Sequence, residues 1–214
     1  MIEETNIEWS IRTWKERHDN GYFPKSDQHR DWKVYDNPPD WLMSLAKPTK
    51  EDTVLEVGCG YGEWMIPLAP YVAGVEGFDI HPSPVCKAIE KFAELGLESL
   101  NATLGDGTRI PYSESTFSLV YSISVFQHLP RDIVRGYLVE SMRVLAPKGR
   151  MFHHFRNADN IGPYPTPATD IVVNHKDDFS VGWTKGQIAD LTHELELDIV
   201  VHDLGLFLVM EAYV

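Results

Sequence analysis

The sequence predicts an α/β fold in which a mostly parallel sheet is covered by helices on both faces, the doubly wound arrangement. From residue 52 onward, apolar runs of strand length alternate with segments of helical spacing, which is typical of a parallel sheet. A glycine-rich turn at residues 58–62 directly follows the first of these runs. At 214 residues the chain has the length of one domain with a substantial core.

The individual elements follow from apolar spacing and from the helix-start and helix-stop signals. We expect strands at residues 53–57, 72–80, 100–105, 117–122 and 150–155, and a final pair at 197–202 and 206–213. We expect helices at residues 61–69, 83–95, 131–145 and 184–195. The second of these helices has Pro82 and Pro84 at its start and Gly96 at its end, the usual asymmetry of helix termini.

Residues 1–47 differ from the rest of the chain and are expected to form an N-terminal helical cap on the domain at 48–214. They contain four of the six tryptophans and few aliphatic runs. We expect one or two amphipathic helices, a polar loop near 18–31 and a short helix at 39–46. Most of these aromatic side chains should pack the cap onto the sheet. A minority, with Tyr164 of a long loop at 156–182 and Trp183 directly after it, would line a substrate pocket.

Charge and composition exclude several classes of protein. Acidic residues outnumber basic ones 32 to 19, which disfavours nucleic acid or an anionic membrane as the main partner. No apolar run approaches the ~18 residues of a membrane span, and the acidic N-terminus lacks a signal peptide's apolar core. We therefore expect a cytoplasmic protein. Cys59 and Cys86 alone provide neither a disulfide framework nor a thiolate zinc site.

The strongest motif is VLEVGCGYG at residues 54–62. It joins a strand, a glycine turn and a helix start in the order that a cofactor site at the carboxyl edge of a parallel sheet requires. Its G-x-G-x-G spacing differs from the G-x-G-x-x-G turn that binds the pyrophosphate of dinucleotides. Glu56 lies two residues before Gly58, where a pyrophosphate would be repelled. The motif therefore favours a cofactor with a cationic end.

Further polar groups follow the next strands. Asp79 ends the second strand, and its two carboxylate oxygens suit the paired hydroxyls of a ribose. Asp106 ends the third strand, where it can accept the amino group of an adenine, while Gly107 leaves room for the ring. Each carboxylate alone is equally well explained as a helix cap. Together, Glu56, Asp79 and Asp106 place three carboxylates at the ends of three successive strands. This arrangement favours one binding site.

These motifs resemble those of class I S-adenosylmethionine-dependent methyltransferases. The resemblance runs from about residue 50 to 155 and includes GFDIHPSPV, GDGTRIPYSESTFSLVYSISVFQHLP and LAPKGRMF. It implies a Rossmann-like, seven-stranded sheet whose last strand, near 206–213, is antiparallel. It also implies S-adenosylmethionine as cofactor, with the cofactor-binding positions Glu56, Gly58, Cys59, Gly60, Tyr61, Gly62, Asp79, Ile80, Asp106, Gly107, Ser122 and Gln127.

The implied reaction is methyl transfer to a small molecule, with oxygen as the expected acceptor atom. An alcohol or phenol acceptor needs a general base, for which histidine suits neutral pH. The candidates are His128, which a structural role explains slightly better, and the adjacent His153 and His154. Alternation along a strand sends those two to opposite faces, so at most one faces the pocket. His153, His154 and Asp159 together have the donor atoms of a metal site. Their spacing is not tight, however, which favours the interpretation that no metal binds there.

Three other functions remain as alternatives. An aminopropyltransferase would use the decarboxylated cofactor, but residues 121–129 contain no carboxylates for a polyamine. A protein that kept the fold and lost catalysis would bind the cofactor or serve as a scaffold without transferring its methyl group. A nicotinamide-dependent reductase is the most distant alternative, because the glycine spacing differs from its fingerprint.

Overall fold

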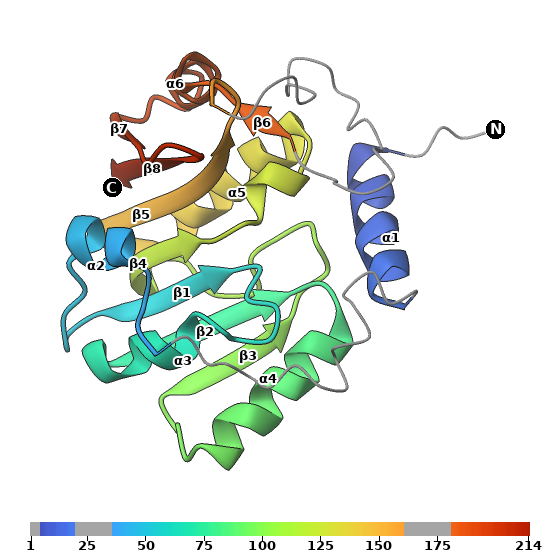
Figure 1. Ribbon diagram of the computed structural model, residues 1–214, viewed down its shortest axis with the longest axis vertical. Coiled ribbons are helices and arrows are strands. Elements are labelled where there is room, and N and C mark those ends of the chain that lie inside the picture. Colours follow the sequence, from blue (N-terminus) through green and yellow to red (C-terminus); the bar gives the residue numbers. More distant parts are fainter. Residues whose placement is uncertain (1–4, 20–35, 161–180) are drawn as a thin grey trace. The chain divides into compact units, whose positions relative to one another are not determined.

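A computed structural model describes residues 5–19, 36–160 and 181–214 (Figure 1). The chain forms two compact units, Met1–Pro111 and Tyr112–Val214. Within the described residues, no helix has the length and apolar character needed to cross a bilayer.

The first unit contains three parallel strands. They are β1 (Thr53–Val57), β2 (Gly74–Asp79) and β3 (Leu100–Leu104), in the order β3-β2-β1. Residue 57 of β1 pairs with residue 78 of β2, and residue 79 of β2 pairs with residue 104 of β3. Since the strands are parallel, their carboxyl ends meet at one edge, where the sequence predicted a site.

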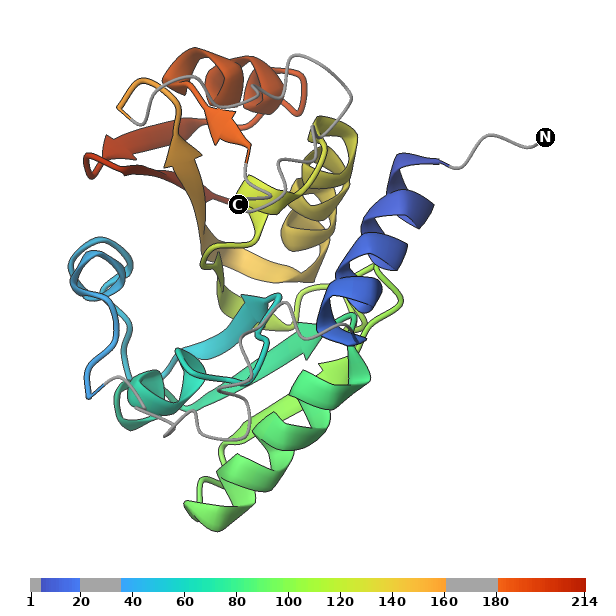
Figure 2. The same ribbon diagram turned by 45° about the vertical axis from the view of Figure 1, so that its right-hand side comes forward.

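The first unit has a helix before residue 20 and a short helix at 40–46, where the sequence predicted helices. Its helices are α1 (Asn6–Asp19), α2 (Asp40–Ala46), α3 (Met65–Leu68), the 3-10 turn η2 (Ala69–Tyr71) and α4 (Pro82–Glu94). Figure 2 shows α4 alongside β2 and β3. The polar loop expected near 18–31 and Trp32 lie largely outside the described residues. The cap boundary at residue 47 stays a prediction.

One helix is shorter than its prediction. The expected helix at 61–69 begins only at Met65, because residues 59–62 form a tight turn closed by a 2.8 Å bond from Gly62 N to Cys59 O. Gly60 and Gly62 have φ of +50° and +75°, outside the right-handed helical region. The glycines that identify the turn therefore also delay the helix.

The second unit confirms the antiparallel final strand. Its strands are β4 (Phe117–Ser122), β5 (Leu145–Asn157), β6 (Gly182–Trp183), β7 (Ile199–Asp203) and β8 (Phe207–Tyr213). Their order is β4-β5-β8-β7, with β6 paired to β5. Strand β4 is parallel to β5, and β8 is antiparallel to both β5 and β7.

Strand β5 is longer than the predicted 150–155. It begins at Leu145, and its register against β4 shifts between Phe117 and Leu119, so residues 147–149 form an irregularity within the strand. Lys148 in this irregularity has a φ of +66°. The two-residue strand β6 was not predicted.

The helices of the second unit are the 3-10 turn η3 (Phe126–His128), α5 (Arg131–Val144) and α6 (Lys185–His193). In α5 the residues at the predicted helical spacing are mostly buried, which confirms its amphipathic pattern. Helix α6 begins with a capping box, in which Thr184 and Gln187 satisfy each other's backbone N–H groups.

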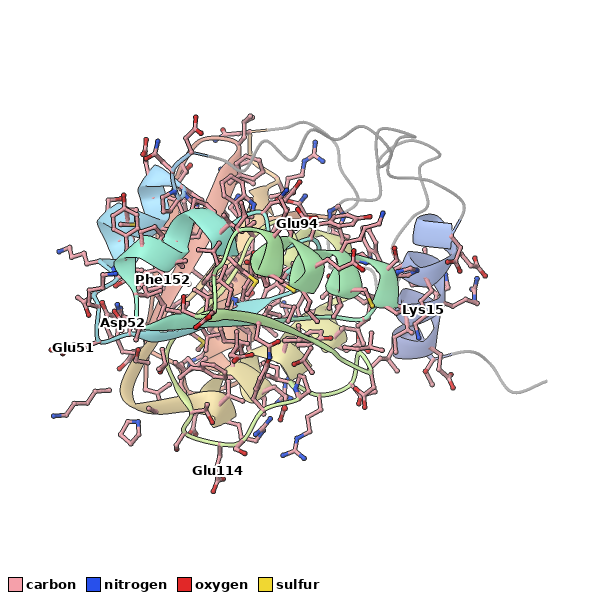
Figure 3. All side chains as sticks on the ribbon, turned by 90° about the horizontal axis from the view of Figure 1, so that it is seen from below. Lys15, Glu51, Asp52, Glu94, Glu114 and Phe152 are labelled. Atoms are coloured by element: carbon pink, nitrogen blue, oxygen red, sulfur yellow. The ribbon has the colours of Figure 1, made fainter. Side chains whose placement is uncertain are left out.

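Charged and apolar side chains are segregated as the composition predicts (Figure 3). Phe152 on β5 is fully buried, whereas Glu51, Glu94 and Glu114 are exposed. Asp52 is an exception, since it is buried just before β1 and accepts a 2.7 Å bond from Thr49 N. The acidic excess therefore lies mainly on surfaces, while this one carboxylate orders the start of a strand.

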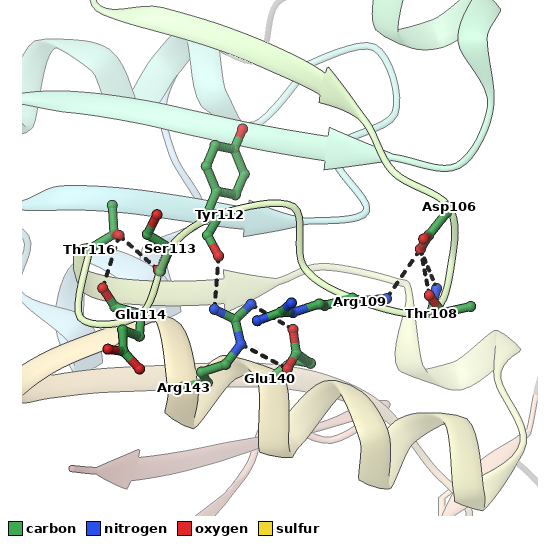
Figure 4. Close-up of polar contacts among 9 residues, drawn as sticks. All are labelled: Asp106, Thr108, Arg109, Tyr112, Ser113, Glu114, Thr116, Glu140 and Arg143. Atoms are coloured by element: carbon green, nitrogen blue, oxygen red, sulfur yellow. Dashed lines mark hydrogen bonds and ion pairs between the residues drawn. The ribbon is translucent and has the colours of Figure 1, made fainter.

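An arginine joins α5 to the loop before β4 (Figure 4). Arg143 forms a two-bond pair with Glu140, at 2.8 and 2.7 Å, and donates to the carbonyl of Tyr112 at 2.8 Å. Because both charged side chains are largely buried, the bonds are weakly screened.

We expect Arg143→Ala to lower the free energy of unfolding by about 1–3 kcal/mol, since it leaves Glu140 and the Tyr112 carbonyl without their donor. Urea unfolding measures the change. The control is Arg135→Ala on the same helix, where a half-exposed side chain lies 3.9 Å from Glu194 and the expected loss is below about 0.5 kcal/mol. Equal losses in both variants would contradict the assignment.

Candidate cofactor and acceptor site

The glycine turn is tied to the end of β2 by backbone bonds. Gly58 N and Cys59 N both donate to the carbonyl of Phe78, each at 3.0 Å. Gly58, Gly60 and Gly62 all have positive φ, between +50° and +75°. The turn therefore needs its glycines for conformation, because other residues adopt this region at a cost.

The glycines differ in what surrounds them. A Cβ on Gly62 would lie 2.4 Å from the ring of Phe92 on α4, so this glycine lets the helix pack onto the turn. A Cβ on Gly77 would lie 2.7 Å from Cys59. A Cβ on Gly60 would meet nothing within 4 Å among the described residues. Gly60 is therefore the position at which a ligand can approach the backbone.

Asp79 holds the turn from the other side. Its carboxylate accepts from Gly60 N at 3.0 Å and from His81 N at 3.1 Å. Desolvation raises the pKa of Asp79, and the N–H bonds from His81 and Gly60 oppose this shift. The carboxylate predicted to bind a ribose thus also orders the backbone that follows β1 and β2.

Two carboxylates give the glycine turn a negative electrostatic potential. Glu56 is 1% exposed on β1, and Asp79 is half-buried at the end of β2. The pKa of the buried Cys59 thiol is raised, first by burial and then by the charges of Asp79 and Glu56. Both charges therefore act at the turn itself, an environment that favours a cationic group.

Asp106 is exposed and stabilises its own loop (Figure 4). One carboxylate oxygen accepts from Thr108 N and Thr108 Oγ1, both at 2.8 Å, and from Arg109 N at 3.3 Å. These bonds, the one from Thr108 N above all, lower the pKa of Asp106. The Asp106 carboxylate therefore remains ionised at neutral pH.

Gly107, predicted to lie beside the adenine, is in contact with helix α1. Gly107 has a φ of +88°, and a Cβ there would lie 2.7 Å from Cγ1 of Ile11 on α1 and 3.4 Å from Ile80. The lack of a Cβ at Gly107 thus lets Ile11 of α1 approach the end of β3 closely. No local pattern predicts this contact, because Ile11 and Gly107 are 96 residues apart in the chain.

In the second unit, His153 and Ser122 form a fully buried pair. His153 Nδ1 lies 3.0 Å from Ser122 Oγ, and the imidazole stacks on Phe126 at 4.5 Å between centroids. Burial lowers the pKa of His153 to about 3. His153 Nε2 has no hydrogen-bond partner among the described residues.

His154 faces the other side of β5, as strand alternation predicted. Its Nδ1 accepts from Ser124 N at 3.3 Å, and the ring packs against Phe207 of β8 at 4.3 Å. Burial lowers the pKa of His154 to about 4. Both histidines are thus neutral and weakly basic near pH 7, which makes them poor proton acceptors.

The 3-10 turn after β4 carries the remaining candidates. Gln127 is buried, and its amide nitrogen lies 3.2 Å from His128 Nε2. The Gln127 side-chain oxygen has no partner among the described residues, while its backbone carbonyl accepts from Val181 N. His128 is half-buried and is the most accessible of the three candidate histidines.

The other sequence candidates lie elsewhere. Trp183 is fully buried against Phe155, so it belongs to the core of the second unit. Tyr164 lies outside the described residues. Asp159 donates its backbone N–H to Asn157, and no three His, Cys, Asp or Glu side chains of the described residues are arranged as metal ligands. No motif in the sequence predicted a role in the site for Ser10, Ile11 or His81.

Because His153 and His154 are buried, we predict that the free energy of unfolding depends on pH in the acid range. Unfolded histidine has a pKa near 6.5, so between pH 6.5 and 4 the unfolded chain binds protons that the folded chain excludes. The free energy of unfolding should therefore decrease as pH falls, by about 1.4 kcal/mol per pH unit for each histidine. We expect His153→Phe to remove one such contribution from the slope.

Denaturant unfolding between pH 6.5 and 4 measures this slope. The control is His193→Gln, which changes an exposed histidine on α6 and should leave the slope unaltered. A His153→Phe slope identical to that of the parent protein would show that His153 is protonated in the folded state.

Comparison with known proteins agrees with this geometry. A family model described as a methyltransferase domain matches residues 54–149. Residues 54–149 thus match a methyltransferase domain. This match contains the glycine turn, Asp79, Asp106 and the whole of α5.

Relatives of this methyltransferase domain act on different atoms. Nocamycin O-methyltransferase of Saccharothrix syringae is 31% identical over 133 residues, 59% of this chain and 43% of that protein. A sterol 4-C-methyltransferase of Caenorhabditis elegans is 31% identical over 97 residues, 45% of this chain and 28% of that protein. The matched regions span less than half the length of these curated relatives.

A solved methyltransferase shares the fold over the whole chain. The 1,6-didemethyltoxoflavin-N1-methyltransferase of Burkholderia thailandensis, solved with 1,6-didemethyltoxoflavin and S-adenosylhomocysteine, is 17% identical. It covers 100% of this chain and 92% of its own, with a TM-score of 0.72. This agreement confirms the Rossmann-like fold class with its mostly parallel sheet.

Proposed function

We propose that the protein transfers the methyl group of S-adenosylmethionine to a small-molecule acceptor, with oxygen as the methylated atom. The observation that carries the proposal is the turn at Gly60, which is open on one side and lies in the field of two carboxylates, Glu56 and Asp79. The net charge of −13 supports a small acceptor rather than a nucleic acid.

The residues of the first unit suit the cofactor's parts. In the proposal Asp79 and Ile80 hold the ribose, Asp106 and Gly107 the adenine, and Glu56 the cationic methionine end. The turn itself comprises Gly58, Cys59, Gly60, Tyr61 and Gly62. Ser122 and Gln127 of the second unit are assigned to the methionine tail and the acceptor; the unsatisfied Gln127 oxygen supports a ligand there.

The sulfonium supplies an activated methyl group, so the chain's residues mainly need to align the acceptor with it and exclude water. Of the three histidines, we propose His128 as the group that accepts the acceptor's proton. It is half-buried on η3, and its Nε2 lies 3.2 Å from the Gln127 side-chain nitrogen, so the Gln127 amide has to turn away before Nε2 takes up the acceptor's proton. The low pKa values of His153 and His154 support structural roles for those two.

The test begins with the cofactor. S-adenosylhomocysteine at a hundredfold excess over its dissociation constant should stabilise the protein by ~2.7 kcal/mol, read as a higher melting temperature. NAD at the same concentration serves as the control and should leave the melting temperature unchanged. The absence of any shift with S-adenosylhomocysteine would overturn the proposal.

The acceptor is identified with methyl-labelled S-adenosylmethionine and a fractionated metabolite extract. Tandem mass spectrometry should find the label on an oxygen of a small molecule. Label on nitrogen or carbon would overturn the assignment of oxygen, and transfer of an aminopropyl group would overturn methyl transfer. Cofactor binding without any transfer would favour a non-catalytic protein.

A further inference from the structure

Helix α1 presents one buried side. Ser10 is 3% exposed, and Ile7, Ile11 and Trp14 at neighbouring helical positions are half-buried. These four residues are spaced i, i+3, i+4 and i+7, which places them on a single face. The helix therefore packs against the protein along this face.

Two contacts place helix α1 on the first unit. Ile11 occupies the space beside Gly107, at the end of β3. Asp19, the last residue of the helix, lies 3.3 Å from Nε2 of His81, just after β2. Eight residues separate Ile11 from Asp19, about 12 Å along a helix. The helix thus spans the carboxyl ends of two strands that carry the proposed adenosine site.

The His81 ring links the helix to the ribose position. Its Nδ1 accepts from Ser83 N at the start of α4, so the ring proton is on Nε2 and points to the Asp19 carboxylate. The His81 backbone N–H donates to Asp79. The same residue therefore binds both the end of α1 and the carboxylate assigned to the ribose.

The Ser10 hydroxyl is a buried polar group whose hydrogen-bonding capacity is not satisfied within the described residues. Ser10 Oγ has no hydrogen-bond partner among the described residues, not even a carbonyl of the preceding turn, to which a helical serine commonly donates. A buried hydroxyl without a partner is destabilising, because it has lost its hydrogen bonds to water. Such a group in a binding protein is explained when a ligand supplies the partner.

We propose that Ser10 hydrogen-bonds the adenine of bound S-adenosylmethionine, and that Ile11 forms the apolar wall against the ring. This rests on the proposed placement of adenine at Asp106 and Gly107. Adenine offers ring nitrogens that accept and an amino group that donates, and a serine hydroxyl suits either. Helix α1 then belongs to the cofactor site rather than to the acceptor cap alone.

Isothermal titration calorimetry tests the proposal with two ligands, S-adenosylhomocysteine and 5′-methylthioadenosine, which lacks the amino-acid tail. Ser10→Ala should weaken both by a similar factor, roughly tenfold. The control Thr13→Ala removes a hydroxyl from the same helix and should change neither affinity by more than about twofold. Should the alanine variant fail to fold, Ser10→Cys keeps the size and replaces the hydroxyl by a weak donor.

Unchanged affinities for both ligands would overturn the proposal. A loss confined to S-adenosylhomocysteine would place Ser10 at the methionine end and overturn it as well. Parent protein that binds neither ligand would overturn the proposed function itself, whereas parent binding with an unaffected Ser10→Ala variant would remove only the role of Ser10.

Discussion

Asp79→Ala is expected to abolish the stabilisation of the protein by S-adenosylhomocysteine. The substitution removes the proposed acceptor of both ribose hydroxyls and also the partner of Gly60 N and His81 N. Loss of two hydrogen bonds to a charged group corresponds to an affinity at least 100-fold weaker. A ligand concentration that stabilises the parent by ~2.7 kcal/mol would then stabilise the variant by no more than ~0.4 kcal/mol.

Thermal unfolding with and without ligand measures the loss. The matched control is Glu76→Gln, which changes a half-buried carboxylate on the same strand that accepts from Asn101 at 3.0 Å. Its ligand-induced shift should equal that of the parent. Asp79→Asn should lose nearly as much of the ligand-induced shift as Asp79→Ala, because the amide nitrogen of asparagine would face one of the two N–H donors. An Asp79→Ala variant with the full shift would contradict the site.

Gly62→Ala is expected to give the largest loss of stability among single changes in the turn. Its Cβ would lie 2.4 and 2.6 Å from two ring carbons of Phe92, and its φ of +75° strains any side chain. Overpacking and the left-handed backbone together should lower the free energy of unfolding by about 2–5 kcal/mol. Chemical denaturation of the ligand-free protein measures this.

Gly60→Ala is the matched comparison, since it shares the turn and the positive φ but has open space around its Cβ. We expect about 1 kcal/mol of destabilisation and a clear loss of S-adenosylhomocysteine affinity. The two variants thus separate the packing role of one glycine from the binding role of the other. Equal stability losses, with cofactor affinity untouched in Gly60→Ala, would contradict that division.

The local part of the fold was predictable because it depends on short-range patterns. The glycine turn, the proline start of α4 and the apolar spacing of α5 are each contained within about fifteen residues, and the structure confirms them. The strand at β8 was predicted from its apolar residues, but its antiparallel orientation was expected only through the family resemblance. Its pairing with β5 joins residues more than fifty positions apart, which no local pattern specifies.

The structure adds what depends on contacts between distant segments. Alternation predicted that His153 and His154 face opposite ways, but not that both are buried and poorly basic. The position of α1 against Gly107 depends on Ile11, an ordinary apolar residue of an amphipathic helix. The assignment of the twelve cofactor positions remains a prediction that the variants above test.

The buried thiol of Cys59 has a consequence for a protein that holds a methylating agent. A sulfonium alkylates thiolates, and the thiolate rather than the thiol is the nucleophilic form of cysteine. Burial and the charges of Asp79 and Glu56 raise the pKa of Cys59 and keep it protonated. In the proposed site, the carboxylates that attract the cofactor's positive end thereby also protect the turn from self-methylation.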